Sequence, residues 1–285
     1  MGFAPRAFTA IAAPLFFLAG IASAQPSPDA KPQAFPKVTI AGSLLRTMKS
    51  ASTGRDYDLY IHLPTDYDPA KGKKYPVLYI LDGQWDFKLM DCILGGLVYD
   101  RFMDQIMLVG ITYSGENANY NDLRAMDLTP TATPNVKGSG DGPKFLKFLK
   151  TEVIPFIEAN YAADPSHRLL QGSSYAGLFT LYALFTDPDL FSGYMAASPA
   201  VPYDNNDIVK REAAYASAHK ELHARLFLAV GGWEGLADPV REFMKTLQSR
   251  NYEGFQLETR VIEGERHASN KPELFNRGLK YLFSN

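Results

Sequence analysis

The chain has 285 residues, of which 46% are hydrophobic and 21% charged, so it can bury a sizeable core and is neither a disordered nor a low-complexity protein. Its formal net charge is −2, from 29 basic and 31 acidic residues, which gives no basic footprint for nucleic acid. The lone Cys92 excludes an intramolecular disulfide, and its apolar neighbours predict a buried structural thiol.

The first 24 residues have the pattern of a signal peptide. Arg6 precedes an apolar run that ends at Ala22, and Ala22-Ser23-Ala24 has the small-residue spacing of a cleavage site. A membrane anchor is the alternative, but the run is shorter than the roughly 20 residues of a comfortable span. We therefore predict an exported protein, periplasmic or secreted, with a Pro-rich leader at 25–36 and no stable membrane insertion once the signal is removed.

The first half of the remaining chain changes pattern part-way. Residues 37–48 and 55–64 alternate apolar and polar side chains, which predicts two paired antiparallel strands. Residues 75–83 and 105–113 are almost continuously apolar, as expected of strands covered on both faces. Residues 143–161 have the spacing of a helix.

The second half alternates strands with helices. We expect strands at 167–174, 190–199, 224–232 and 255–264, with helices at 175–187, 238–250 and 272–283. The first of these helices is apolar on nearly every side, which predicts that it is buried. The whole pattern predicts an α/β fold in one domain from residue 37 to 285: a doubly wound, mostly parallel sheet with an antiparallel start and helices on both faces.

The stretch QGSSYAG places two serines between a predicted strand and a predicted helix. A nucleophilic serine on such a sharp turn needs small residues two positions before and after it. Ser174 has Gly172 and Ala176 there, whereas Ser173 has large neighbours, so Ser174 is the candidate nucleophile. The amide of Tyr175, at the amino end of the buried helix, would face a developing oxyanion. An ordinary strand-to-helix turn is the alternative.

A serine nucleophile needs a base, and histidine has a suitable pKa near neutral pH. Ligands gather at the carboxyl ends of the strands of such a sheet. Only His267 follows the end of a predicted strand there. The other four histidines lie within a strand, at its opposite end, or on or near a polar helix: His62, His167, His219 and His223. His267 is the candidate base, with an ordinary surface histidine as the alternative.

The third member of such a site is an acid that orients the histidine. Glu234 comes immediately after the strand at 224–232, and Asp238 follows one turn later. We favour Glu234 and keep Asp238 as the alternative acid, although Asp238 is also suited to cap the next helix. Glu263 and Glu265 are close to the candidate base in sequence and are further alternatives.

Six motifs in order resemble one family. YPVLYILDGQ, VGITYS, RAMDLTPT, GSSYAGLF, SPA and EGERH are similar to the "putative esterase" branch of the α/β hydrolases, and the likeness runs from about residue 56 to 283. That branch includes esterase D type thioester hydrolases, feruloyl esterases, enterobactin-type siderophore esterases and mycolyltransferases of antigen 85 type.

The resemblance implies a role for each candidate residue. Ser174 would be the nucleophile, His267 the base and Glu234 the acid, and the LDG turn would supply a second oxyanion amide from Gly83 or Gln84. Ala176 replaces the family's usual glycine. Some siderophore esterases of the family are thought to use a Ser-His dyad, so a dyad stays open. Arg124 and Asp127 match family positions, and we interpret them as a structural ion pair or loop anchor as readily as substrate contacts.

We therefore predict an exported serine esterase that cleaves a carboxylic ester through an acyl-enzyme. An acyltransferase with the same nucleophile and a non-catalytic binding protein of this fold are the alternatives. The expected partner is a small-molecule or polymer-linked ester, and siderophore, aromatic, lipid and peptide esters all stay open. No sequence pattern indicates a cofactor or a metal site, since the glycine-rich stretch 138–142 lacks the G-K-[ST] ending of a phosphate loop.

Overall fold

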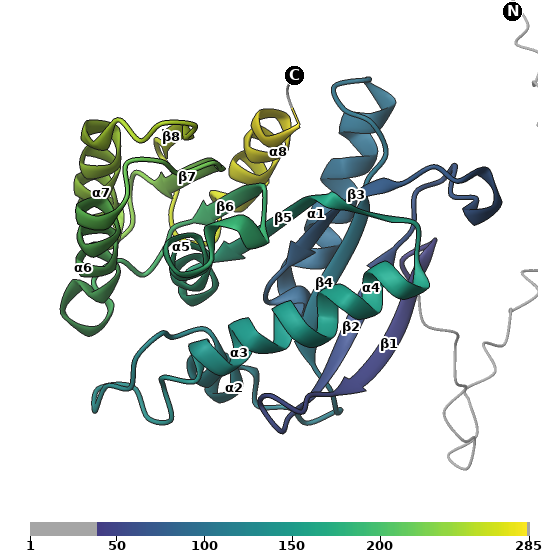
Figure 1. Ribbon diagram of the computed structural model, residues 1–285, viewed down its shortest axis with the longest axis horizontal. Helices are drawn as coiled ribbons and strands as arrows, with labels where there is room; N and C mark the ends of the chain where they lie inside the picture. Colours follow the sequence, from purple (N-terminus) through teal and green to yellow (C-terminus); the bar gives the residue numbers. More distant parts are fainter. Residues whose placement is uncertain (1–38, 284–285) are drawn as a thin grey trace, which may run out of the picture. The chain divides into compact units, whose positions relative to one another are not determined.

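The computed structural model describes residues 39–283, and an eight-stranded sheet runs through them in the order β1-β2-β4-β3-β5-β6-β7-β8 (Figure 1). The strands are β1 Ser43–Lys49, β2 Asp56–His62, β3 Tyr75–Ile80, β4 Met107–Tyr113, β5 Ala163–Ser173, β6 Gly193–Ala197, β7 Arg225–Gly231 and β8 Gln256–Ile262. β2 is antiparallel to both β1 and β4, and all other neighbours are parallel. The predicted mostly parallel sheet with an antiparallel start is confirmed.

Helices cover both faces of this sheet, because the central strands bury side chains on both sides. In β3, Val77 and Tyr79 join one hydrophobic cluster while Leu78 and Ile80 join the other. The second cluster includes side chains of α1 Gly83–Tyr99 and α8 Lys271–Leu282. The first includes side chains of α3 Gly142–Phe148, the π-helical turn η2 Leu149–Val153, α4 Ile154–Asn160, α5 Tyr175–Thr186, α6 Tyr203–Ala218 and α7 Ala237–Arg250.

Helix α5 is the central helix of the first face. Ten consecutive residues, from Ala176 to Phe185, are buried, which confirms the expectation from its all-round apolar sequence. The predicted helix at 143–161 is also present, as the run α3, η2 and α4, which crosses the sheet as one teal band in Figure 1.

Three helices have no counterpart among the predicted ranges. They are α1, α2 Tyr120–Asp127 and α6, and the remaining short elements are the 3-10 turns η1 Pro69–Lys71 and η3 Pro188–Leu190. Helix α1 starts directly from the strand end without a side-chain cap, so its first turn carries no ordinary start signal. The prediction of a buried Cys92 is wrong, because α1 turns this thiol outward and the residue is exposed. Neighbouring apolar residues in a helix point in different directions, so an apolar run does not bury each member.

The predicted signal peptide at 1–24 and leader at 25–36 lie outside the described residues, as does the start of the domain at residue 37. Between residues 39 and 283, no helix combines the length and the apolar character needed to cross a membrane.

Candidate active site

Ser174 occupies the sharp turn between β5 and α5. Its backbone has φ 63° and ψ −119°, a conformation that non-glycine residues rarely adopt. The turn is so tight that a Cβ on Gly172 would lie 2.2 Å from the carbonyl oxygen of Ala176. Glycine is therefore required at 172, as the sequence argument supposes. Ala176 itself is fully buried and fits inside the first turn of α5.

The neighbouring strand β6 holds this turn in place. The amide of Ser174 donates to the carbonyl of Ala197 at 2.9 Å, and the carbonyl of Ser174 accepts from the amide of Ala200 at 3.1 Å. Ser173 is the last residue of β5 and only 3% exposed. Ser174 lines the cavity described below, and Ser173 is not among the residues that line it.

His267 and Glu234 meet although they are 33 positions apart in the chain. His267 Nδ1 lies 2.5 Å from Glu234 Oε2. Glu234 is on the loop after β7 and His267 on the loop after β8, and these loops approach because Gly231 has no side chain. A Cβ on Gly231 would lie 2.7 Å from the carbonyl oxygen of Glu265. The close approach of two backbones is what places the acid beside the histidine.

The other carboxylate oxygen of Glu234 is held by three donors. Oε1 accepts from the hydroxyl of Ser198 at 2.6 Å, the amide of Gly231 at 2.7 Å and the side-chain amide of Asn270 at 3.1 Å. Burial would raise the pKa of the Glu234 carboxyl, but hydrogen bonds from His267, Ser198 and the Gly231 amide outweigh it and leave this pKa below its usual value. Glu234 is therefore an ionised, oriented partner for His267.

Sequence reasoning missed Ser198 and Asn270. Both are fully buried, and Asn270 also donates to the Ser198 hydroxyl at 2.8 Å. Ser198, the first residue of the SPA motif, directly follows β6 and has φ 42°, a positive value that could not be foreseen from the residue type. Asn270 directly precedes α8, which suggests a cap, but its side chain caps nothing and faces Glu234 instead.

The alternative acids point elsewhere. The side chain of Asp238 is 92% exposed and pairs with Arg241 at 3.2 Å, and Asp238 lies in the first turn of α7 without capping it. Glu263 also pairs with Arg241, at 3.4 Å. Among these carboxylates and that of Glu234, only Glu234 has a contact with His267.

Ser174, His267 and Glu234 line one cavity of about 670 Å³. Its remaining walls are mainly apolar and aromatic and come from Tyr175, Ala200, Pro202, Tyr203, Gly235 and Leu236. In residues 39–283, no cluster of three or more His, Cys, Asp or Glu side chains is placed to hold a metal ion. The arrangement can therefore present a hydroxyl, an imidazole and a carboxylate to a substrate in a partly apolar chamber.

The predicted oxyanion amides belong to two adjacent turns. Tyr175 begins α5 after β5, and Gly83 begins α1 after β3. These strands are parallel neighbours in register, with Ile80 opposite Gln171, so both turns start at the same level of the sheet. The first amides of a helix have no acceptor within the helix and are free to bind an anion.

The side chain of Gln84 is turned toward β4. Its Oε1 accepts from the Thr112 hydroxyl at 2.7 Å and its Nε2 donates to Oδ1 of Asp82 at 3.4 Å, so what Gln84 can offer an oxyanion is its backbone amide.

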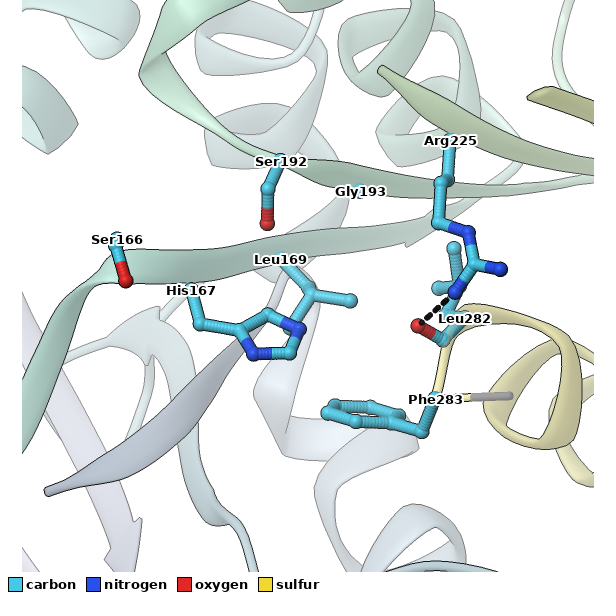
Figure 2. Close-up of a pocket in the computed structure, with 8 residues that line it drawn as sticks. All are labelled: Ser166, His167, Leu169, Ser192, Gly193, Arg225, Leu282 and Phe283. Carbon is cyan, nitrogen blue, oxygen red and sulfur yellow. Dashed lines mark hydrogen bonds between the residues drawn. The ribbon is translucent and has the colours of Figure 1, made fainter. Parts of the chain in front are cut away.

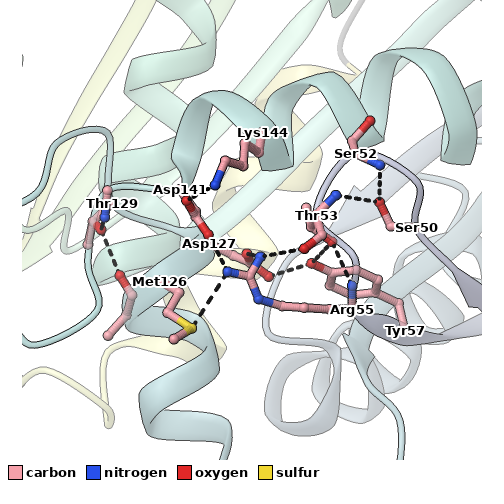
Figure 3. Close-up of polar contacts among 12 residues, drawn as sticks. Ser50, Ser52, Thr53, Arg55, Tyr57, Met126, Asp127, Thr129, Asp141 and Lys144 are labelled. Atoms are coloured by element: carbon pink, nitrogen blue, oxygen red, sulfur yellow. Dashed lines mark hydrogen bonds and ion pairs between the residues drawn. The ribbon is translucent and has the colours of Figure 1, made fainter.

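Arg124 and Asp127 are both anchors, but they are not partners of each other. Arg124 pairs with Asp82 at 2.7 Å, and Asp127 pairs with Arg55 at 3.0 Å. Asp127 also accepts from the hydroxyl of Tyr57 at 2.6 Å (Figure 3). Burial raises the pKa of the fully buried Asp127 to about 6. This network attaches the carboxyl end of α2 to β2.

A smaller cavity of about 280 Å³ lies at the opposite ends of the strands (Figure 2). It is lined by Ser166, His167, Leu169, Ser192, Gly193, Arg225, Leu282 and Phe283. The ring of His167 packs 5.6 Å from that of Phe283, and burial lowers the pKa of His167. His167 is therefore a packed residue far along β5 from Ser174, in agreement with its position in the sequence.

The sequence of this chain matches a known protein family. Residues 50–276 match the family described as Putative esterase. The chain belongs to this family. It is 30% identical over 263 residues to the ferri-bacillibactin esterase of Bacillus subtilis, covering 85% of this chain and 90% of the relative. A siderophore enterobactin esterase of Emericella nidulans is 29% identical over 227 residues, covering 74% of this chain and 73% of that protein.

The solved structures agree. The crystal structure of the BES protein from Bacillus cereus superposes with a TM-score of 0.79 at 25% identity, covering 90% of this chain and all of the other. The predicted α/β-hydrolase fold is thereby confirmed, as is the resemblance to the Putative esterase family. Membership of this family makes the chain a carboxylic ester hydrolase.

Proposed function

We propose that this protein is an exported serine esterase that hydrolyses ester bonds of a siderophore through an acyl-enzyme. Ser174 Oγ attacks the ester carbonyl and forms the acyl bond, while His267 takes the hydroxyl proton and returns it to the leaving alcohol. Water then attacks the acyl-enzyme, and His267 takes the water proton and returns it to Ser174 Oγ as the acyl bond breaks and the carboxylic acid is released. Glu234 holds the imidazole with Nδ1 as the donor, which leaves Nε2 free to accept the proton.

One observation carries the proposal: the shared cavity of Ser174 and His267 with Glu234 at 2.5 Å from the imidazole. The short contact and the lowered pKa of Glu234 favour a triad over a Ser-His dyad. The amides of Tyr175 and of Gly83 or Gln84 would bind the oxyanion.

Two further parts of the proposal have different support. The siderophore substrate is supported by the relatives, whose names are those of siderophore esterases. Export is supported by the signal-peptide pattern of residues 1–24.

The test is active-site labelling with a fluorophosphonate and peptide mapping of the adduct. We expect the adduct on Ser174, no adduct in Ser174→Ala, and turnover of a siderophore ester panel lost in both Ser174→Ala and His267→Ala. A folded protein that hydrolyses these esters equally well without Ser174 would refute the mechanism. Labelling on Ser174 without siderophore hydrolysis would refute the substrate class alone.

A further inference from the structure

A single side chain on α2 bridges the two turns that would bind the oxyanion. The Nε of Arg124 donates to both oxygens of the Asp82 carboxylate, at 3.0 and 3.1 Å, and Nη2 donates to Oδ2 at 2.7 Å. Nη2 also donates to the carbonyl of Ser173 at 3.4 Å. Asp82 directly precedes Gly83, and Ser173 directly precedes Ser174, so Arg124 contacts the residue before each turn.

The bridge is nearly dry. The Arg124 side chain is 12% exposed and that of Asp82 3%, so water screens their attraction little. A planar guanidinium that binds a carboxylate through two nitrogens also fixes its orientation, which a lysine ammonium cannot do. Asp82 needs such a hold because its φ of 53° is a left-handed conformation that is costly for a non-glycine residue.

Aromatic rings of the same two turns enclose the guanidinium. The central carbon of Arg124 lies 5.5 Å from the ring of Trp85 and 5.3 Å from the ring of Tyr175, distances at which a cation is attracted to a ring face. Trp85 is in the first turn of α1 and Tyr175 in the first turn of α5. At each turn, Arg124 therefore contacts both the residue that precedes the turn and an aromatic ring in the helix that follows it.

We propose that Arg124 is a positioning residue that sets the distance and orientation between the two oxyanion amides. This inference rests on the proposed function, since it needs Ser174 to form a tetrahedral intermediate. Oxyanion donors act because they are aligned before the charge develops, so a donor that is displaced loses most of its effect. Arg124 itself would touch neither the substrate nor the reacting atoms.

The test is Arg124→Lys, which keeps the charge and loses the two-nitrogen fork. We expect kcat on an activated ester to fall roughly 10- to 100-fold, somewhat less than the loss of a whole oxyanion donor, with KM unchanged within about threefold because ground-state binding is unaffected. The affinity for a boronic acid, whose serine adduct mimics the tetrahedral intermediate, should fall in proportion to kcat/KM.

Arg250→Lys is the matched control. Arg250 binds the buried carboxylate of Glu212 through two nitrogens, at 2.8 and 2.9 Å, between α7 and α6 and away from Ser174. We expect this variant to keep wild-type kcat and boronic acid affinity. Asp82→Asn is the second test variant, because it weakens the same pair from the other side and should lower kcat in the same direction.

Each outcome separates the two proposals. Wild-type protein that hydrolyses no ester and is not labelled on Ser174 would refute the proposed function itself. An active wild type with a folded Arg124→Lys that keeps kcat and boronic acid affinity would overturn the positioning role alone. Failure of both Arg124→Lys and Asp82→Asn to fold, beside a folded Arg250→Lys, would assign the pair to fold stability and also overturn it.

Discussion

Replacing Glu234 by glutamine should disable the histidine without disturbing the fold. Three donors converge on Oε1, namely Ser198, the Gly231 amide and Asn270, so the carbonyl oxygen of a glutamine would take that position. Its NH₂ group would then face Nδ1 of His267, where the carboxylate now accepts at 2.5 Å. Two donors cannot share a hydrogen bond, so the imidazole would turn to the tautomer with its proton on Nε2.

That tautomer cannot accept the proton of Ser174. The equivalent aspartate-to-asparagine change in a serine protease lowers kcat about 10⁴-fold for this reason, which corresponds to about 5.5 kcal/mol in the activation barrier. We expect a loss of that order here. The folded state should change little in stability, because the glutamine oxygen still satisfies the donors on the Oε1 side.

The measurement is kcat/KM for a chromogenic ester, together with thermal unfolding to confirm that the variant is folded. Asp238→Asn is the control, because this carboxylate is 92% exposed and does not contact His267, and it should keep full activity. The reasoning would be refuted by a Glu234→Gln enzyme within tenfold of wild type, which would mean that the protein works as a Ser-His dyad.

Two predictions concern stability. Gly172→Ala would place a Cβ 2.2 Å from the carbonyl oxygen of Ala176 and should lower the free energy of unfolding by about 3 kcal/mol or more. Ala176→Gly should lower it by only about 1 kcal/mol and retain activity. Equal melting temperatures for the two variants would contradict this steric argument. The pKa of Asp127, raised to about 6, means that the folded state binds this proton more tightly than the unfolded chain. The contribution of this proton to the free energy of unfolding is therefore fully present below the unfolded pKa of about 4 and is lost as pH rises through 6. The change amounts to about 3 kcal/mol. Denaturant unfolding at pH 4.5 and 7.5 should show that the stability of wild type relative to Asp127→Asn is higher at pH 4.5. A pH-independent difference in stability between the two proteins would contradict the raised pKa.

Much of the fold can be derived from local pattern. Apolar runs predicted the buried strands, and alternating apolar and polar residues predicted the antiparallel start. A strand buried on both faces has a continuous apolar sequence, whereas a strand buried on one face alternates. The same holds for Ser174, since only small residues fit around a strained turn, and the Gly172 contact shows that this steric demand is real. His267 followed from its place after the last strand. These four features needed no knowledge of distant contacts.

The tertiary structure decided which side chains meet. Glu234, Asp238 and Glu263 all flank the same two strand ends, and only the path of the loops past Gly231 turns one of them toward His267. The Ser198 and Asn270 contacts with Glu234 join residues 36 positions away on either side.

The partner of Arg124 could not be read from its motif either. Asp127 is three positions away in sequence, but Asp82, 42 positions away, is the residue it binds. The periodicity of apolar residues indicates which face of a helix or strand is buried. The pairing of two charged side chains depends instead on which loops lie close together in the folded protein. Candidate roles for single residues can therefore be derived from the sequence. The network that would make them act together depends on β3, β5, β6, β7 and β8, which lie in this order in one sheet.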